Sequence, residues 1–120
     1  MCLTTIKEIP INTNKGYKLF RKFTKTYTPV FQCTDISYIL NTWTTDKNNY
    51  RIRNQSNETY FTGFHIFLTL EDVKGWLGTV PICDNEVYCE VEFEDVVTAG
   101  MQDGYPCVVA KKMRIIKECV

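Results

Sequence analysis

Hydrophobic and polar residues alternate along much of the chain, and this two-residue period is typical of β-strands with one buried face. The clearest case is the segment Glu86–Val97, where Val87, Cys89, Val91 and Phe93 occupy one face. The intervening residues are polar or charged: Glu86, Tyr88, Glu90, Glu92 and Glu94. We therefore expect this segment to be extended, with its apolar side chains directed inward and its carboxylates directed outward.

Aromatic and β-branched residues between turn-forming residues predict further strands. These are Tyr17–Phe23, Tyr27–Gln32, Tyr50–Arg53, Thr59–Phe67 and Cys107–Lys117. The segment Ile36–Thr44 fits either a helical face or extended chain. The glycines in Ala99–Tyr105 favour a loop there.

A short helix is predicted over residues 69–77. Thr69 is a suitable N-cap, and Glu71 and Asp72 place negative charge where the helix dipole favours it. Leu70, Val73, Trp76 and Leu77 form its apolar face, and Gly78 can end it. The expected fold is therefore α+β: a mainly antiparallel sheet of about five to seven strands with one short helix packed on it.

The length of 120 residues predicts a single compact domain over residues 1–120. Residues 1–15 are less regular and are expected to form an N-terminal arm. The first ten residues show no secretory signal, and no apolar run has transmembrane length, which favours a cytoplasmic location. The formal net charge is zero, so direct binding to nucleic acid is not expected.

Charge is unevenly distributed along the chain. Residues 1–60 carry nine basic and four acidic side chains, whereas residues 61–120 carry five basic and ten acidic ones. The acidic half includes the carboxylates that alternate along one strand: Glu86, Glu90, Glu92 and Glu94. Neighbours of like charge repel unless opposed. Two interpretations stay open: pairing with a basic strand, through Lys18 and Lys22 or through Lys112 and Arg114, or binding of a basic partner protein.

A second candidate surface combines aromatic and basic residues near the N-terminus with the single histidine. Tyr17, Phe20, Arg21 and His65 could bind a nucleotide by stacking and charge. Aromatic residues on strands are also frequent core residues, and His65 could be a buried structural side chain. Both alternatives stay open from the residues alone.

The six cysteines include no C-x-x-C pair, and this spacing favours free thiols over zinc ligands or disulfides. No phosphate-binding glycine loop or catalytic triad pattern occurs. We therefore predict no catalytic residue, no metal site and no cofactor. The alternating carboxylates do not follow the pattern of a calcium loop.

Three motifs carry a resemblance to a known group of proteins. Residues 16–21 read GYKLFR, residues 63–65 read GFH and residues 110–115 read AKKMRI. In this order they resemble small accessory proteins encoded by bacteriophages and prophages, over roughly residues 16–118. The resemblance implies a role in the host-cell cytoplasm, where such proteins often bind and block a host defence component. It assigns no functional residue.

The sequence therefore predicts a non-catalytic binding protein that inhibits a host protein through the acidic strand face. A nucleotide-binding module is the alternative, and self-association stays open. Arg21 on an early strand and Glu90 on a late strand also resemble the layout of ADP-ribosyltransferases. In that family an arginine holds the dinucleotide and a glutamate stabilises charge at the sugar, so the resemblance implies a second, enzymatic alternative.

Overall fold

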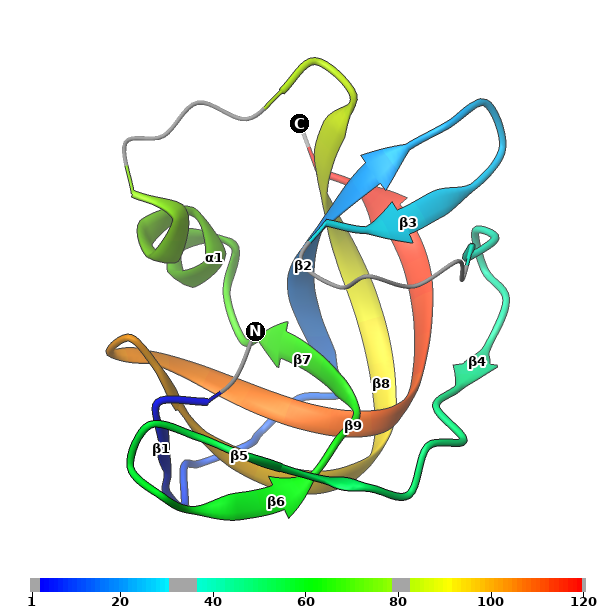
Figure 1. Ribbon diagram of the computed structural model, residues 1–120. Helices are drawn as coiled ribbons and strands as arrows, with labels where there is room; N and C mark the ends of the chain where they lie inside the picture. Colours follow the sequence, from blue (N-terminus) through cyan, green and yellow to red (C-terminus); the bar gives the residue numbers. More distant parts are fainter. Residues whose placement is uncertain (1–2, 31–36, 79–82, 120) are drawn as a thin grey trace.

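The computed structural model describes residues 3–30, 37–78 and 83–119, and it is mainly an antiparallel sheet with one short helix (Figure 1). This confirms the predicted α+β class. The helix is α1 (Leu70–Leu77). The strands are β1 (Thr5–Ile6), β2 (Lys15–Lys22), β3 (Tyr27–Pro29), β4 (Thr44–Thr45), β5 (Arg51–Arg53), β6 (Thr59–Phe61), β7 (Phe64–Phe67), β8 (Glu86–Gln102) and β9 (Tyr105–Glu118).

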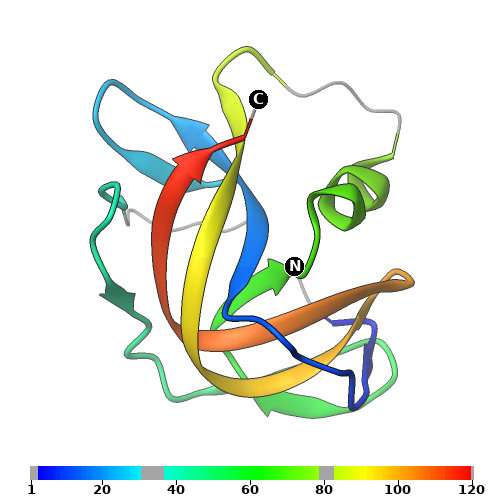
Figure 2. The same ribbon diagram turned by 180° about the vertical axis from the view of Figure 1, so that it is seen from behind.

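Four strands of the main sheet pair in a closed ring. β8 pairs with β2, β2 with β7, β7 with β9, and β9 with β8 again. The long strands β8 and β9 curve around the ring, as both views show (Figures 1 and 2). β1 and β4 extend the sheet from β8 and β9, β3 pairs with β2, and β5 and β6 form a separate hairpin.

Two apolar clusters hold the fold together. One lies on the inner side of the ring and includes Phe20, Phe64 and Val91, each at most 4% exposed. The other lies between the outer side of the ring, α1 and the β5–β6 hairpin, and includes Phe67 and Val73. The inner cluster contains Cys89, Val91 and Phe93 of β8, so the inward direction predicted for this strand's apolar face is confirmed.

The helix begins and ends where the sequence predicts. The Thr69 hydroxyl accepts a hydrogen bond from the backbone N–H of Asp72 at 3.0 Å. Gly78 ends the helix with a φ of 71°, a conformation that residues with a Cβ adopt only at a cost. Because a helix of eight residues is marginal alone, burial of Val73 against the sheet stabilises it.

The loop predicted over Ala99–Tyr105 is wrong. β8 continues to Gln102, and only Asp103 and Gly104 form the turn into β9. Their φ values of 51° and 92° are the positive pair that a tight type I′ hairpin requires. The hairpin therefore joins the two longest strands directly.

One further segment differs from expectation, and one alternative that the sequence left open is decided. Thr59–Phe67 is not one strand: it divides into β6 and β7, which belong to different sheets. The described part of Ile36–Thr44 contains no helix, and β4 begins at its end. Ile36 lies outside the described residues. The strand predicted over Tyr27–Gln32 is observed as β3, and its last two residues, 31–32, also lie outside the described residues.

Candidate binding surface

The candidate site is the outer face of β2, β8 and β9, beside α1. The strand register places Tyr17 of β2 opposite Glu90 of β8, and Arg21 opposite Glu86. On the other side of β8, Arg114 of β9 lies opposite Glu92. We call this the outer face; its residues are Tyr17, Arg21, Glu86, Tyr88, Glu90, Glu92, Glu94, Arg114 and Lys117.

The two middle carboxylates of the alternating series are held by cations of β9. Glu92 forms an ion pair with Arg114 at 3.0 Å, and Glu90 forms one with Lys117 at 3.7 Å. The two glutamate side chains are only 17% and 14% exposed. Cross-strand charge pairs of this kind contribute roughly 0.2–1 kcal/mol each. The geometry thus favours pairing within the sheet for Glu90 and Glu92.

The two end carboxylates are placed differently. Glu86 accepts a hydrogen bond from the backbone N–H of Cys83 at 2.7 Å, and Glu94 is exposed. Lys112 lies opposite Glu94 in the register, yet its ammonium pairs with Asp95 at 3.7 Å. Among the described residues, neither Glu86 nor Glu94 forms an ion pair, so both charges can face a partner.

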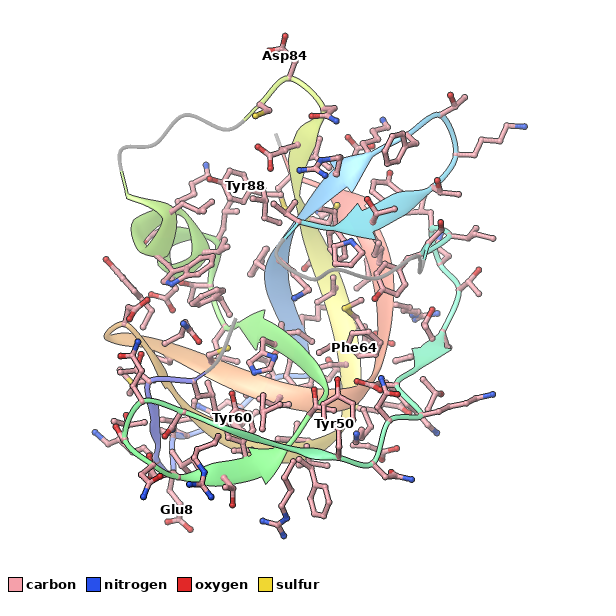
Figure 3. The ribbon with its side chains drawn as sticks, in the orientation of Figure 1. Glu8, Tyr50, Tyr60, Phe64, Asp84 and Tyr88 are labelled. Atoms are coloured by element: carbon pink, nitrogen blue, oxygen red, sulfur yellow. The ribbon has the colours of Figure 1, made fainter. Side chains whose placement is uncertain are left out.

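Two half-buried tyrosines, Tyr17 of β2 and Tyr88 of β8, share the outer face with these carboxylates. Burial, reinforced by Glu90, raises the pKa of Tyr17. Burial, reinforced by Glu86, raises the pKa of Tyr88. The ammonium of Lys74 in α1 lies 5.6 Å from the centre of the Tyr88 ring. Figure 3 shows Tyr88 beside α1, so the helix forms one border of the outer face.

The four residues of the alternative nucleotide site do not converge. Tyr17 and Arg21 lie on the outer face, whereas Phe20 lies on the opposite face of β2 and is 0% exposed. His65 is 1% exposed, with Nε2 3.0 Å from the Tyr60 hydroxyl. Burial, together with the charge of Lys18, lowers the pKa of His65 to about 3, so its ring is neutral near pH 7. This geometry favours a structural role for His65.

The pair of residues behind the ADP-ribosyltransferase resemblance is also separated. Arg21 lies opposite Glu86, and Glu90 lies opposite Tyr17. Four strand residues therefore separate Arg21 from Glu90 along the sheet, or about 13 Å. The register therefore does not make these two side chains neighbours on the sheet.

Cysteines at four described positions are free, which confirms the predicted thiols at Cys83, Cys89, Cys107 and Cys119. Burial raises the pKa of Cys89 and of Cys107 to about 12, so both stay protonated and unreactive at neutral pH. Cys2 and Cys33 lie outside the described residues. Within the described ranges no helix has the length and apolar character to cross a membrane, and no cluster of three metal-binding side chains occurs.

The sequence-based site did not include Tyr88 or Lys74. Tyr88 carried a usable signal, because it interrupts the glutamates at the same two-residue spacing and therefore shares their face. Lys74 carried none, since only the packing of α1 on the sheet brings its ammonium to the Tyr88 ring.

Comparisons with protein-family models, with curated proteins and with solved structures found no match to this chain.

Proposed function

We propose that the chain is a binding protein that docks on a basic surface of another protein through the outer face. The observation that carries this proposal is the division of the carboxylates. Glu90 and Glu92 are ion-paired within the sheet. Glu86 and Glu94, at the two ends of the alternating series in β8, form no ion pair with any residue that the structure describes, and Tyr88 lies between them along the strand. Tyrosine supplies a large contact area and a hydroxyl at low entropic cost, which suits protein interfaces.

The dimensions of the outer face fit a protein partner. Eight strand residues separate Glu86 from Glu94, which corresponds to about 26 Å along an extended chain. Three neighbouring strands of this length span roughly 26 by 14 Å. Interfaces of ordinary size bury about 800 Å² on each partner, so the outer face would form the central part of such an interface. The face carries both positive and negative side chains. Electrostatic complementarity would therefore favour a partner whose charges match this pattern in position and sign.

The partner class rests on the resemblance to phage accessory proteins. This resemblance implies that the partner is a protein of the host cytoplasm and that binding of the chain inhibits it. The geometry adds what that partner must offer: two basic groups spaced to meet Glu86 and Glu94, and a surface between them that accepts the Tyr88 ring.

The outer face can be tested by affinity capture from host-cell extract, with the wild-type chain and two tyrosine variants as bait. Tyr88→Ala removes a ring from the outer face, whereas Tyr50→Ala removes an equally large ring that is 57% exposed and lies away from Tyr88 (Figure 3). The bound protein is identified with wild type, and its affinity is then measured for each variant. We expect Tyr88→Ala to weaken binding by on the order of tenfold or more and Tyr50→Ala to leave it unchanged. Equal affinity of Tyr88→Ala and wild type would contradict the proposal.

A further inference from the structure

A cavity of about 290 Å³ lies where three separate segments meet: the residues just before β1, the turn between β5 and β6, and the turn between β8 and β9. Among the described residues, Leu3 is the one apolar side chain of its lining. The other lining residues are polar: Thr4, Arg53, Asn54, Gln55, Gln102 and Asp103. A space of this volume corresponds to about ten water molecules, so it can admit a small molecule.

The walls of the cavity are fixed by hydrogen bonds between these segments. The Asp103 carboxylate accepts from the Thr4 hydroxyl at 3.1 Å and from the Trp76 indole N–H at 2.9 Å. The Asp103 backbone N–H donates to the Thr4 hydroxyl at 2.8 Å. On the opposite wall, the Asn54 side chain donates to the Glu58 carboxylate and accepts from its backbone N–H. A site held in this way is organised before a ligand arrives.

Other groups in the lining retain unused hydrogen-bonding capacity. Gln102 is 6% exposed, and its Oε1 has no hydrogen-bond partner among the described residues. Leaving a buried acceptor unsatisfied costs about 1–3 kcal/mol, so such a group calls for an explanation. Arg53 is exposed, and within the described ranges it donates one side-chain hydrogen bond, from Nη1 to the Asn57 side chain at 3.0 Å. Its other N–H groups are therefore open to a ligand.

We propose that this cavity binds a small hydroxylated anion of the size of a sugar phosphate, with the phosphate on Arg53 and a hydroxyl group hydrogen-bonded to the Gln102 amide. The planar guanidinium matches a phosphate in shape and charge. Over the residues that the structure describes, the lining contains no aromatic side chain on which a nucleobase could stack. The volume is also at the lower limit for ligand pockets, which favours a sugar phosphate over a nucleotide.

The test is a titration of the full chain, followed by heteronuclear NMR, with ribose 5-phosphate, ribose and inorganic phosphate as separate probes. We expect saturable binding of ribose 5-phosphate that shifts the amide signals around Arg53 and Gln102. Ribose and inorganic phosphate each lack half of the contacts, so they should bind on the order of tenfold more weakly or worse. Arg53→Gln and Gln102→Leu should weaken ribose 5-phosphate binding by a similar factor.

Arg51→Gln is the matched control, because Arg51 lies on the same strand and is exposed, but stacks on the Phe61 ring 4.4 Å away and does not line the cavity. It should bind ribose 5-phosphate like wild type. Gln102→Leu should melt no lower than wild type, because it removes an unsatisfied acceptor. The proposal is overturned if wild type shows no saturable binding, if Arg53→Gln binds as tightly as Arg51→Gln, or if inorganic phosphate alone binds as tightly as ribose 5-phosphate. The cavity and the outer face share no residue, so this result is independent of protein docking.

Discussion

Lys18 is a charged side chain that folding removes almost entirely from water. It is 6% exposed, and its ammonium donates to the backbone carbonyl of His65 at 2.9 Å. The strands β2 and β7 share one registered pair, Tyr17 with Phe67, so this hydrogen bond adds a second link between them. Burial lowers the pKa of Lys18 to about 8, because the charged form loses its hydration.

This burial predicts a characteristic pH dependence of stability. The pKa of Lys18 is about 8 in the folded chain and 10.5 in its unperturbed state. Between these values the unfolded chain binds more protons, so the contribution of Lys18 to the free energy of unfolding rises with pH. It should amount to about 3 kcal/mol over the whole window. The measurement is chemical denaturation of wild type and Lys18→Met at pH 8 and at pH 10.5.

The comparison with Lys18→Met is necessary because the buried thiols Cys89 and Cys107 act in the opposite direction. Burial raises the pKa of each thiol to about 12. Each thiol therefore lowers the free energy of unfolding as the pH rises above its unperturbed pKa, because the folded chain then binds more protons than the unfolded chain. Both variants contain these thiols, so the effect of Cys89 cancels in the difference. The effect of Cys107 cancels except for the part that comes from its interaction with Lys18, which is smaller than the effect of burial. If wild type and Lys18→Met change in parallel across the window, Lys18 is not buried as described.

At the scale of elements, the β8–β9 hairpin determines how the ring closes. Its turn was missed because Gly100 and Gly104 together suggested a loop, although Asp103-Gly104 is itself a strong hairpin signal. The structure explains in another way why residue 100 is a glycine: a Cβ there would lie 2.1 Å from the backbone oxygen of Thr5. Gly100 thus allows β1 to approach β8. That approach involves residues 95 positions apart, so no local pattern could reveal it.

The turn itself can be tested with Gly104→Ala. Gly104 has a φ of 92°, and an added Cβ would meet no atom within 4 Å, so the cost is conformational and not steric. We expect a loss of about 1–2 kcal/mol in the free energy of unfolding, measured by chemical denaturation. The reference is the wild-type chain, because replacing the neighbouring Asp103 would also remove hydrogen bonds that its carboxylate accepts from Thr4 and Trp76. A Gly104→Ala chain as stable as wild type would show that the turn has another conformation.

At the scale of the whole molecule, the sequence predicts which side chains of β8 face inward but not which strand neutralises its carboxylates. Alternation within one strand is a local pattern, and it was sufficient to predict that Val91 faces inward and Glu92 outward. Pairing depends on register between distant segments, so both N-terminal and C-terminal lysines remained candidates. The structure selects β9: Lys18 lies opposite Cys89 and is buried, whereas Arg114 reaches Glu92.

The same limit applies to the candidate sites. The outer face was partly predictable, because Glu86 and Glu94 follow from alternation alone. The cavity was not predictable, because its lining comes from three segments that meet only in the folded chain. Phe20 and Arg21 illustrate the difference within one strand: neighbours in sequence lie on opposite faces, so an aromatic-basic cluster in sequence does not make a cluster in space.

The most direct test of the account is the affinity of the captured partner for three charge variants of the chain. Glu86→Lys/Glu94→Lys reverses the two carboxylates that form no ion pair within the described part of the chain, and Glu90→Gln/Glu92→Gln removes the charges of the two that do. Glu8→Lys reverses an exposed charge away from the outer face (Figure 3).

The account predicts that the first variant loses on the order of tenfold or more in affinity while it remains folded. It predicts that the second keeps its affinity and loses some stability, and that Glu8→Lys matches wild type. Full affinity of the Glu86→Lys/Glu94→Lys chain, or an equal loss with Glu8→Lys, would contradict the account.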